Sequence, residues 1–372
     1  LVQHLLLQSY FLSYDTKSFF QPYQIGEGFF GFYGYLISTT THEQVPAMSI
    51  SSSPFAHFEA DLRDQPGPAA SLKAGLIGAG TIFETPFGPK PLIYADYVAS
   101  GRALRQVEEF MISHVLPFYA NSHTEASFTG AHTTALREAA RSEIARRCEA
   151  DADTHAVIFA GSGATAGLNK LVHLFAIRER LSRGEAVTVL VGPYEHHSNL
   201  LPWRESGAEV IELAEAAAGG VDLTDLHTKL GSATAKGLTI AAISAASNVT
   251  GICADVPAVT KIVKQARAKM VWDYAGGGPY LPVSMANEID AIALSPHKFI
   301  GGPGASGVLI LRRDAVHTTT PSQPGGGTVA FVNAYQHDYS EHLEEREEGG
   351  TPNILGDIRA ALALIVKDVI GQ

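Results

Sequence analysis

The stretch ALSPHKFIGGPGASGVLI, Ala293–Ile310, sets Lys298 where an apolar run gives way to a glycine-rich turn that bends back into a second apolar run. Most lysines at strand ends are simply solvated. Here Ser295 and His297 flank the lysine, and the glycines behind it let backbone approach a ligand closely. Because a partly desolvated amine loses its proton more readily and can act as a nucleophile, Lys298 is predicted to form a Schiff base with a carbonyl compound.

Short apolar runs alternate with longer helix-like stretches from about Ile93 onward, which indicates βαβ units. Parallel strands that are buried on both faces give such near-continuous apolar runs. The predicted fold class is therefore α/β, a mostly parallel seven-stranded sheet with helices on both faces. The predicted strands are 155–160, 187–192, 209–213, 238–247, 269–275, 291–295 and 307–312, and the predicted helices include 135–150, 164–181 and 256–269.

Composition narrows the class of protein. The chain has 372 residues, of which 45% are hydrophobic and 17% charged, with a net charge of −11, so a soluble globular enzyme or binder is predicted and no nucleic-acid partner is expected. Cys148 and Cys253 lie far apart without metal-ligand spacing, which predicts neither a disulfide framework nor a zinc site. A reducing compartment is expected, and the cytoplasm is the prediction, with an organelle as the alternative.

Three segments are predicted along the chain. Residues 1–90 are expected to be an N-terminal extension and linker, because residues 51–91 are rich in Pro, Gly and Ser. The first 47 residues carry aromatic bursts but no run of roughly 20 apolar residues, so no membrane span is predicted, and Met48 could be the true start. Residues 91–330 are expected to form a large domain, and residues 331–372 the start of an incomplete small domain.

Polar side chains follow four further predicted strands, namely Thr165, His196, Asn248 and Asp273. The carboxyl ends of parallel strands meet at one edge of a sheet, where ligands bind in α/β folds. A carboxylate at that edge can keep an aromatic ring nitrogen protonated, and a helix N-terminus can bind phosphate. Together with Lys298 these residues predict a phosphorylated aromatic cofactor at this edge.

Two other interpretations concern the same segments. The run GSGATA, Gly161–Ala166, matches G-x-G-x-x-A and would suit a nicotinamide-dependent dehydrogenase, but the acidic residue expected about twenty positions later is missing. Glu195 comes more than thirty residues later, just before His196 and His197. The two histidines lack a third convergent ligand, so no metal site is predicted. A flat ring against an aromatic cofactor suits His196 better.

From about Ile93 to Ile358 the sequence resembles the class V, fold-type I pyridoxal-phosphate enzymes of the cysteine desulfurase and selenocysteine lyase branch. The segments that carry the resemblance are IYADYVASGR, GATAGLN, EHHSNLLPW, SNVTG, WDYAG and SPHKFIGGPG, together with GGGTV and REEGGTPN, which resemble loops that reach toward the partner's cofactor in the family's dimers. The resemblance implies the fold-type I large domain and a homodimer with cofactor sites near the subunit interface.

Site residues follow from the resemblance position by position. It implies three catalytic residues: Lys298 as the Schiff-base lysine, Asp273 paired with the pyridine nitrogen, and His196 stacked on the ring. Asn248 would face the ring oxygen and the substrate. His123, in YANSHTEAS, could line the substrate mouth or be an ordinary loop histidine. The remaining cofactor-binding residues that the resemblance implies are Gly163, Ala164, Thr165, Ala275, Ser295 and His297, with Thr328 from the other subunit.

This sequence departs from the family's pattern at three places. The family's D-x-A-Q motif has a glutamine where Gly276 stands here. A mobile cysteine and a carboxylate-binding arginine belong to a C-terminal subdomain that would follow the last residues of this chain, and neither Cys148 nor Cys253 matches that cysteine.

The departures leave three expectations for function. The resemblance implies a pyridoxal-phosphate enzyme that cleaves a C–S bond of a small amino acid. Transamination or another lyase reaction is the alternative, since the same imine supports several reactions. A catalytically inactive protein that keeps the fold for dimerisation or binding is the third.

Overall fold

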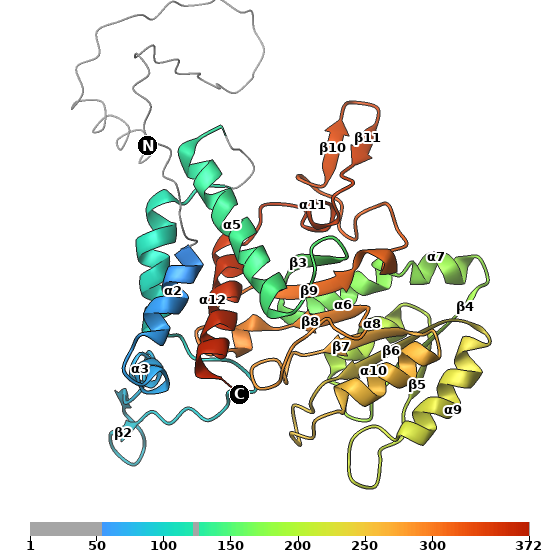
Figure 1. Cartoon of the computed structure of the whole chain (residues 1–372), viewed down its shortest axis with the longest axis horizontal. Helices are drawn as coiled ribbons and strands as arrows, with labels where there is room; N and C mark the ends of the chain where they lie inside the picture. Colours follow the sequence, from blue (N-terminus) through green and yellow to red (C-terminus); the bar gives the residue numbers. More distant parts are fainter. Residues whose placement is uncertain (1–53, 122–125, 372) are drawn as a thin grey trace, which may run out of the picture. The chain divides into compact units, whose positions relative to one another are not determined.

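The computed structural model describes residues 54–121 and 126–371. Its centre is a seven-stranded sheet with the order β3-β9-β8-β7-β6-β4-β5 (Figure 1). Only β9 runs antiparallel to its neighbours in this sheet. The predicted mostly parallel sheet of seven strands is therefore confirmed. The strands are β3 (His155–Gly161), β4 (Ala186–Val191), β5 (Glu209–Glu212), β6 (Gly237–Ser244), β7 (Lys269–Asp273), β8 (Ala291–Leu294) and β9 (Gly307–Arg312).

Helices cover both faces of the sheet, because successive strand residues alternate between two hydrophobic cores. In β8, Ile292 and Leu294 belong to the first core, whereas Ala291 and Ala293 belong to the second. The first core is covered by α5 (Phe128–Arg147), α9 (Leu223–Thr234), α10 (Val256–Gln265) and α12 (Ile354–Ile370). The second is covered by α6 (Gly163–Leu174), α7 (Ile177–Ser182) and α8 (Leu201–Glu205).

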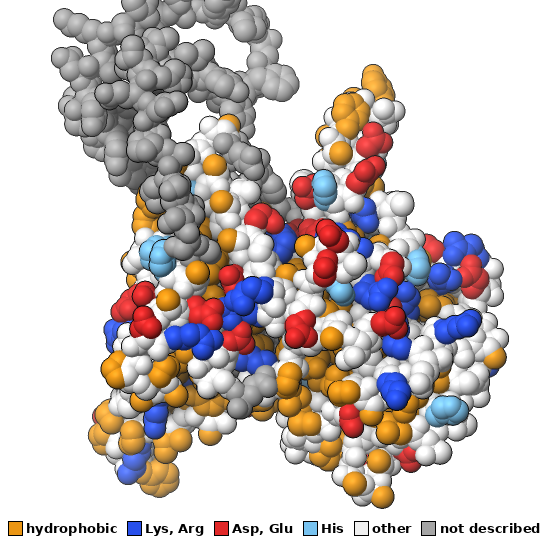
Figure 2. Space-filling view, in the orientation of Figure 1, with side chains coloured by type: hydrophobic (Ala, Val, Ile, Leu, Met, Phe, Trp, Pro, Cys, Tyr) orange, Lys and Arg blue, Asp and Glu red, His pale blue; other side chains and the backbone are white. Residues whose placement is uncertain are grey.

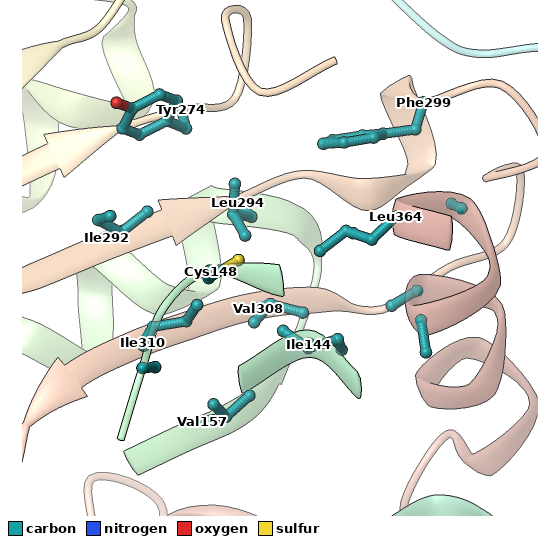
Figure 3. Close-up of a cluster of buried hydrophobic side chains, with 14 of the residues drawn as sticks. Ile144, Cys148, Val157, Tyr274, Ile292, Leu294, Phe299, Val308, Ile310 and Leu364 are labelled. Carbon is teal, nitrogen blue, oxygen red and sulfur yellow. The ribbon is translucent and has the colours of Figure 1, made fainter. Parts of the chain in front are cut away.

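The first core joins elements that are far apart in the sequence. Figure 3 shows the Cys148 side chain beside Leu294 of β8, with Ile144 of α5 and Leu364 of α12 in the same cluster. All four side chains are almost completely buried. Helices α5 and α12 thus share one core with the strand that leads to Lys298, and this rigid packing fixes where that strand ends.

The prediction of a linker over residues 51–91 is wrong for its first part. Residues Pro54–Arg63 form α2 and Pro68–Ala74 form α3, and α2 packs against α12 and α5. Phe55, Phe58 and Leu62 bring three apolar side chains to one helix face, and all three are buried in the first core. Helical periodicity over ten residues therefore outweighs the Pro and Gly content. An exposed hairpin of β1 (Ile82–Phe83) and β2 (Lys90–Pro91) follows.

Between this hairpin and α5 lie α4 (Arg105–Phe110) and two further turns of helix, η1 (Met111–Val115) and η2 (Leu116–Phe118). After the sheet, β10 (Val329–Val332) and β11 (His337–Tyr339) form a separate antiparallel hairpin, followed by α11 (Leu343–Glu347). The buried face of α12 belongs to the first core of the sheet. The predicted domain boundary at residue 330 stays a prediction. None of the helices described in residues 54–121 and 126–371 is long and apolar enough to span a bilayer.

Candidate active site

Five of the predicted site residues lie at the carboxyl ends of parallel strands. Asp273 is the last residue of β7, and Lys298 ends the short helix η4 (Pro296–Lys298) just after β8. Asn248 follows β6, His196 follows β4, and Thr165 lies in the first turn of α6, after β3. Because these strands run in the same direction, their ends share one edge of the sheet, the edge at which ligands bind in α/β folds.

The turn that carries Lys298 is held by its backbone. The Gly101 N–H donates to the carbonyl oxygen of His297 at 3.0 Å, and α12 contacts η4 from another side. A Cβ on Gly101 would lie 1.7 Å from the carbonyl oxygen of Phe299, so only glycine allows this approach. Lys298 itself is half-buried, and its Nζ forms no hydrogen bond or ion pair with any residue that the structure describes. The backbone that carries Lys298 is thus held in place, while its amine is free to contact a ligand.

Asp273 is a buried carboxylate with one oxygen to spare. Its exposed fraction is 3%, and the Ala275 N–H donates to Oδ1 at 2.8 Å. Oδ2 accepts no hydrogen bond from the described part of the chain. Burial raises the pKa of Asp273 to about 6, and the positive charge of Lys298 limits the rise. A cationic ring nitrogen at Oδ2 would supply the partner that this carboxylate lacks.

A cradle of backbone and hydroxyl groups lies at the N-terminus of α6. The Ala164 N–H donates to Ser295 Oγ at 2.9 Å. Gly163 has a φ of 61°, and a Cβ there would lie 2.7 Å from His297 Cε1 and 2.9 Å from Ser295 Oγ. Thr165 Oγ1 donates to Ser198 Oγ at 2.8 Å. Small residues, hydroxyl groups and the positive end of a twelve-residue helix are the features of a phosphate site.

The His196 ring is exposed and held in one tautomer. Its backbone is extended, with φ −65° and ψ 150°, and Nδ1 accepts from the Ser198 N–H at 3.1 Å. The neutral ring therefore carries its proton on Nε2. Partial burial lowers the pKa of His196, and the charges of Lys298 and His197 lower it further. A neutral, flat ring suits stacking better than an imidazolium would.

The positive charge of Lys298 acts on three titratable groups of the candidate site. The ammonium of Lys298 shifts the pKa of Asp273, His196 and His297, in each case after burial as the larger cause. Both histidine pKa values fall because burial disfavours the charged ring and because a second positive charge near Lys298 is unfavourable. The side chains predicted from separate strand ends therefore lie within electrostatic reach of the same amine.

The other predicted residues are placed less closely. Asn248 is exposed, and a Cβ on Gly276, where the family has glutamine, would lie 3.7 Å from the Asn248 Cβ. Ala275 is half-buried beside Asp273. Thr328 is fully buried; its hydroxyl donates to the Gly325 carbonyl at 2.6 Å, and its own carbonyl accepts from the Ser340 N–H at 2.9 Å. His123 lies outside the described residues, and its role stays a prediction.

Glu195 was not predicted as a site residue, although it precedes His196 directly. Its carboxylate accepts four hydrogen bonds, two of them from Ser244 at the end of β6. The signal in the sequence is an acidic residue just beyond an apolar strand, but its partner is 49 residues away and only the fold brings them together. Across the described residues, no three His, Cys, Asp or Glu side chains are grouped so that they could hold a metal ion.

The sequence is similar to those of several cysteine desulfurases. A probable cysteine desulfurase of Halalkalibacterium halodurans is 29% identical over 286 residues, which cover 76% of this chain and 68% of the relative. A probable cysteine desulfurase of Aeropyrum pernix is 31% identical, with 78% and 70% covered. The cysteine desulfurase CsdA of Escherichia coli is 30% identical, with 73% and 66% covered. The chain thus spans about two thirds of the length of these relatives.

Solved structures give the same result. The apo cysteine desulfurase of Thermococcus onnurineus NA1 superimposes with a TM-score of 0.64 at 26% identity, covering 75% of this chain and 68% of the other. The S-sulfonic acid form of Escherichia coli CsdA gives a TM-score of 0.63 at 27% identity, covering 79% and 70%. The family model for class-V aminotransferases matches residues 93–369, which include the whole sheet and every strand end described above. The chain therefore belongs to the class-V aminotransferase family, in its cysteine desulfurase-like branch.

Proposed function

We propose that this chain is a pyridoxal-phosphate-dependent enzyme that cleaves the C–S bond of cysteine or a similar small amino acid. The observation that carries the proposal is the pair formed by Asp273 and Lys298 on neighbouring strands. One is a buried carboxylate with an unused oxygen, and the other is a half-buried amine without a partner in the described chain. The names of the relatives, cysteine desulfurases, support the choice of substrate.

The residues present fit pyridoxal phosphate. Lys298 would hold the aldehyde, Asp273 the pyridine nitrogen, and the cradle of Gly163, Ala164 and Ser295 the phosphate. A Cβ on Gly163 would lie within 2.9 Å of His297 Cε1 and Ser295 Oγ, so glycine lets both side chains come close to the N-terminus of α6. When bound, the cofactor supplies an electron sink that weakens the bonds at the substrate's α-carbon.

The chain's own groups would then manage protons and orientation. Lys298 would be the base that takes the α-proton and returns it, because its Nζ has no competing partner among the described residues. Asp273 would hold a negative charge beside the pyridine nitrogen. The His196 ring accepts a hydrogen bond at Nδ1 and carries its proton on Nε2, so it would cover one face of the cofactor and would donate that proton to a leaving group.

Desulfuration also needs a thiol that accepts the sulfur, so that cysteine leaves as alanine and the acceptor becomes a persulfide. Cys148 does not fit this role, since it is 1% exposed and burial raises the pKa of its thiol to about 12. Cys253 is exposed but follows the asparagine loop. We assign the acceptor to neither residue. Two free cysteines do fit a reducing compartment, and we propose the cytoplasm.

We further propose that two copies of the chain form a dimer through the hairpin of β10 and β11. The hairpin stands away from the sheet, and hydrophobic side chains gather at its tip (Figure 2). Phe331, Val332 and Tyr335 are 47%, 63% and 97% exposed, which is unusual for large apolar side chains close together. Light scattering on the purified protein should give a dimer mass, and Phe331→Ser with Tyr335→Ser should give a monomer. A monomeric parent protein would contradict this part of the proposal.

The cofactor proposal is tested by absorbance. Addition of pyridoxal phosphate should give a visible band that borohydride removes, with the reduced cofactor found on the peptide that contains Lys298. Lys298→Ala should abolish this band, whereas Lys229→Ala, which removes a surface lysine paired with Asp225 on α9, should keep it. A parent protein that gives no band would refute the proposal. Alanine released from cysteine, with an added thiol as sulfur acceptor, then separates desulfuration from transamination.

A further inference from the structure

The Glu195 side chain occupies a closed set of hydrogen-bond donors beside the candidate site. Its Oε1 accepts from the Gly192 N–H at 3.2 Å and the Ser244 N–H at 2.8 Å. Its Oε2 accepts from Asn199 Nδ2 and Ser244 Oγ, both at 2.6 Å. Four donors converge on two oxygens, and two of them are backbone groups that the ends of β4 and β6 would otherwise leave unpaired.

These bonds continue into the second core. Asn199, fully buried, accepts from Trp203 Nε1 at 3.0 Å through the amide oxygen opposite the nitrogen that binds Glu195. Trp203 is itself fully buried in α8. A small cavity beside the carboxylate, lined by Tyr194, Glu195 and Ser244 among others, has a volume of only about 10 Å³. It has room for a single water at most.

The four hydrogen bonds to the Glu195 carboxylate, here called the anchor, bear on the position of the next residue, His196. Two of the four bonds tie the Glu195 carboxylate to Ser244 of β6, so the chain is fixed at the residue just before His196, whose own backbone is extended. The His196 ring lies close enough to Lys298 for the positive charge of the amine to act on it. We propose that Glu195 is a positioning residue that holds the His196 ring over the cofactor site. This inference rests on the proposed function and assigns to Glu195 no direct contact with cofactor or substrate.

A glutamine at this position separates geometry from charge. Burial raises the pKa of Glu195 to about 7, its hydrogen bonds limit the rise, and the nearby Asp273 adds to it. Glu195→Gln removes the charge but keeps the length and one acceptor oxygen for the two backbone N–H groups. Glu195→Ala removes every bond of the anchor. If Glu195 acts by orienting His196, Glu195→Gln should retain most of the cofactor affinity and dichroism that Glu195→Ala loses.

The experiment is a double-mutant cycle between positions 195 and 196, read by pyridoxal phosphate affinity and by the visible circular dichroism of the bound cofactor. Glu195→Ala should weaken binding by about ten-fold and reduce the dichroism, and Glu195→Gln should restore both to within about three-fold. In a His196→Ala background, Glu195→Ala should change neither signal further, since a residue that acts only through the ring has nothing left to position.

A matched control is Asp290→Asn. Asp290 is also a buried carboxylate that accepts a backbone N–H, from Met270 at 2.8 Å, but it lies just before β8 at the opposite end of the sheet. The variant Asp290→Asn should lower the denaturation midpoint, as Glu195→Ala does, but it should leave the dichroism of the bound cofactor unchanged.

The outcomes separate two failures. If the parent protein binds no cofactor, the proposed function fails. If it binds, and Glu195→Ala either leaves the dichroism intact or adds its full effect to His196→Ala, the positioning role fails and the proposed function stands. Equal dichroism losses in Glu195→Ala and Asp290→Asn would also overturn the positioning role, because they would mark a general loss of stability.

Discussion

Asp273 and Lys298 lie at the ends of two adjacent parallel strands, and the charge of the amine acts on the carboxyl group. Burial raises the pKa of Asp273 to about 6 because water no longer solvates the carboxylate, and the ammonium limits this rise. Ionisation of the Asp273 carboxyl group is therefore unfavourable until a protonated ring nitrogen binds beside it. The affinity of the site for a protonated ring nitrogen and the stability of the cofactor-free protein are therefore linked through one carboxyl group.

Cofactor binding should weaken in acid. Below about pH 6 the Asp273 carboxyl group takes up a proton and can no longer pair with a cationic ring nitrogen. The affinity for pyridoxal phosphate, measured by absorbance titration, should fall about ten-fold between pH 7 and pH 5. Asp273→Asn should bind weakly at every pH and lose this dependence. An unchanged pH profile in Asp273→Asn would show that a histidine of the site is responsible instead.

The same substitution should stabilise the cofactor-free protein at neutral pH. Because the folded-state pKa is raised from 3.8 to about 6, the folded chain binds a proton more tightly than the unfolded chain between these values. Stability from this group is therefore present in acid and falls as pH rises toward 6, by up to about 3 kcal/mol. Urea denaturation at pH 7.5 should give a higher midpoint for Asp273→Asn than for the parent. A lower midpoint would contradict the assigned cost of ionisation.

Gly101 should tolerate no side chain. A Cβ there would overlap the Phe299 carbonyl oxygen, a backbone atom that cannot move without shifting the Lys298 turn. Gly101→Ala should cost about 2–4 kcal/mol of unfolding free energy and weaken cofactor binding as well. Gly231→Ala, within α9 with no atom inside 4 Å of the added Cβ, should instead stabilise by about 0.5–1 kcal/mol. Equal effects at the two glycines would show that the close approach at Gly101 is unimportant.

The sheet was predictable because it is buried on both faces, which makes strands such as β8 and β9 read as unbroken apolar runs. The location of the candidate site could then be predicted, because the carboxyl ends of parallel strands lie at one edge of the sheet and bring the polar residues there close together. Helix α2 was missed because its three apolar anchors sit in a segment rich in turn-forming residues. Glu195 was missed for a different reason, since its main partner, Ser244, approaches only when β6 pairs with β4.

The loop REEGGTPN contains a buried ion-pair network that the sequence did not reveal. Glu348 Oε1 accepts from Arg141 Nη1 and from the Phe159 N–H, each at 2.7 Å, and Oε2 accepts from Arg141 Nη2 at 2.9 Å and Arg137 Nη2 at 2.5 Å. Arg137 Nε also donates to Asp357 of α12 at 2.7 Å. One carboxylate thus ties the edge strand β3 to α5, and through Arg137 to the helix that supports η4.

Removal of this carboxylate should be among the most destabilising single changes in the chain. Glu348→Gln leaves two guanidinium groups, whose side chains are only 11% and 12% exposed, without a full counter-charge, at a cost of about 3–5 kcal/mol. Burial opposes ionisation of Glu348, but the two arginines outweigh it and hold its pKa below the usual value, so the stabilisation is present at neutral pH and is lost as pH falls through that lowered pKa. Glu138, the other carboxylate that pairs with Arg141, has a side chain that is 53% exposed. Glu138→Gln should therefore change the free energy of unfolding by less than about 1 kcal/mol. Urea denaturation of both variants at pH 7 checks the contrast, and similar midpoints would mean that the buried network contributes no more than an ordinary surface pair.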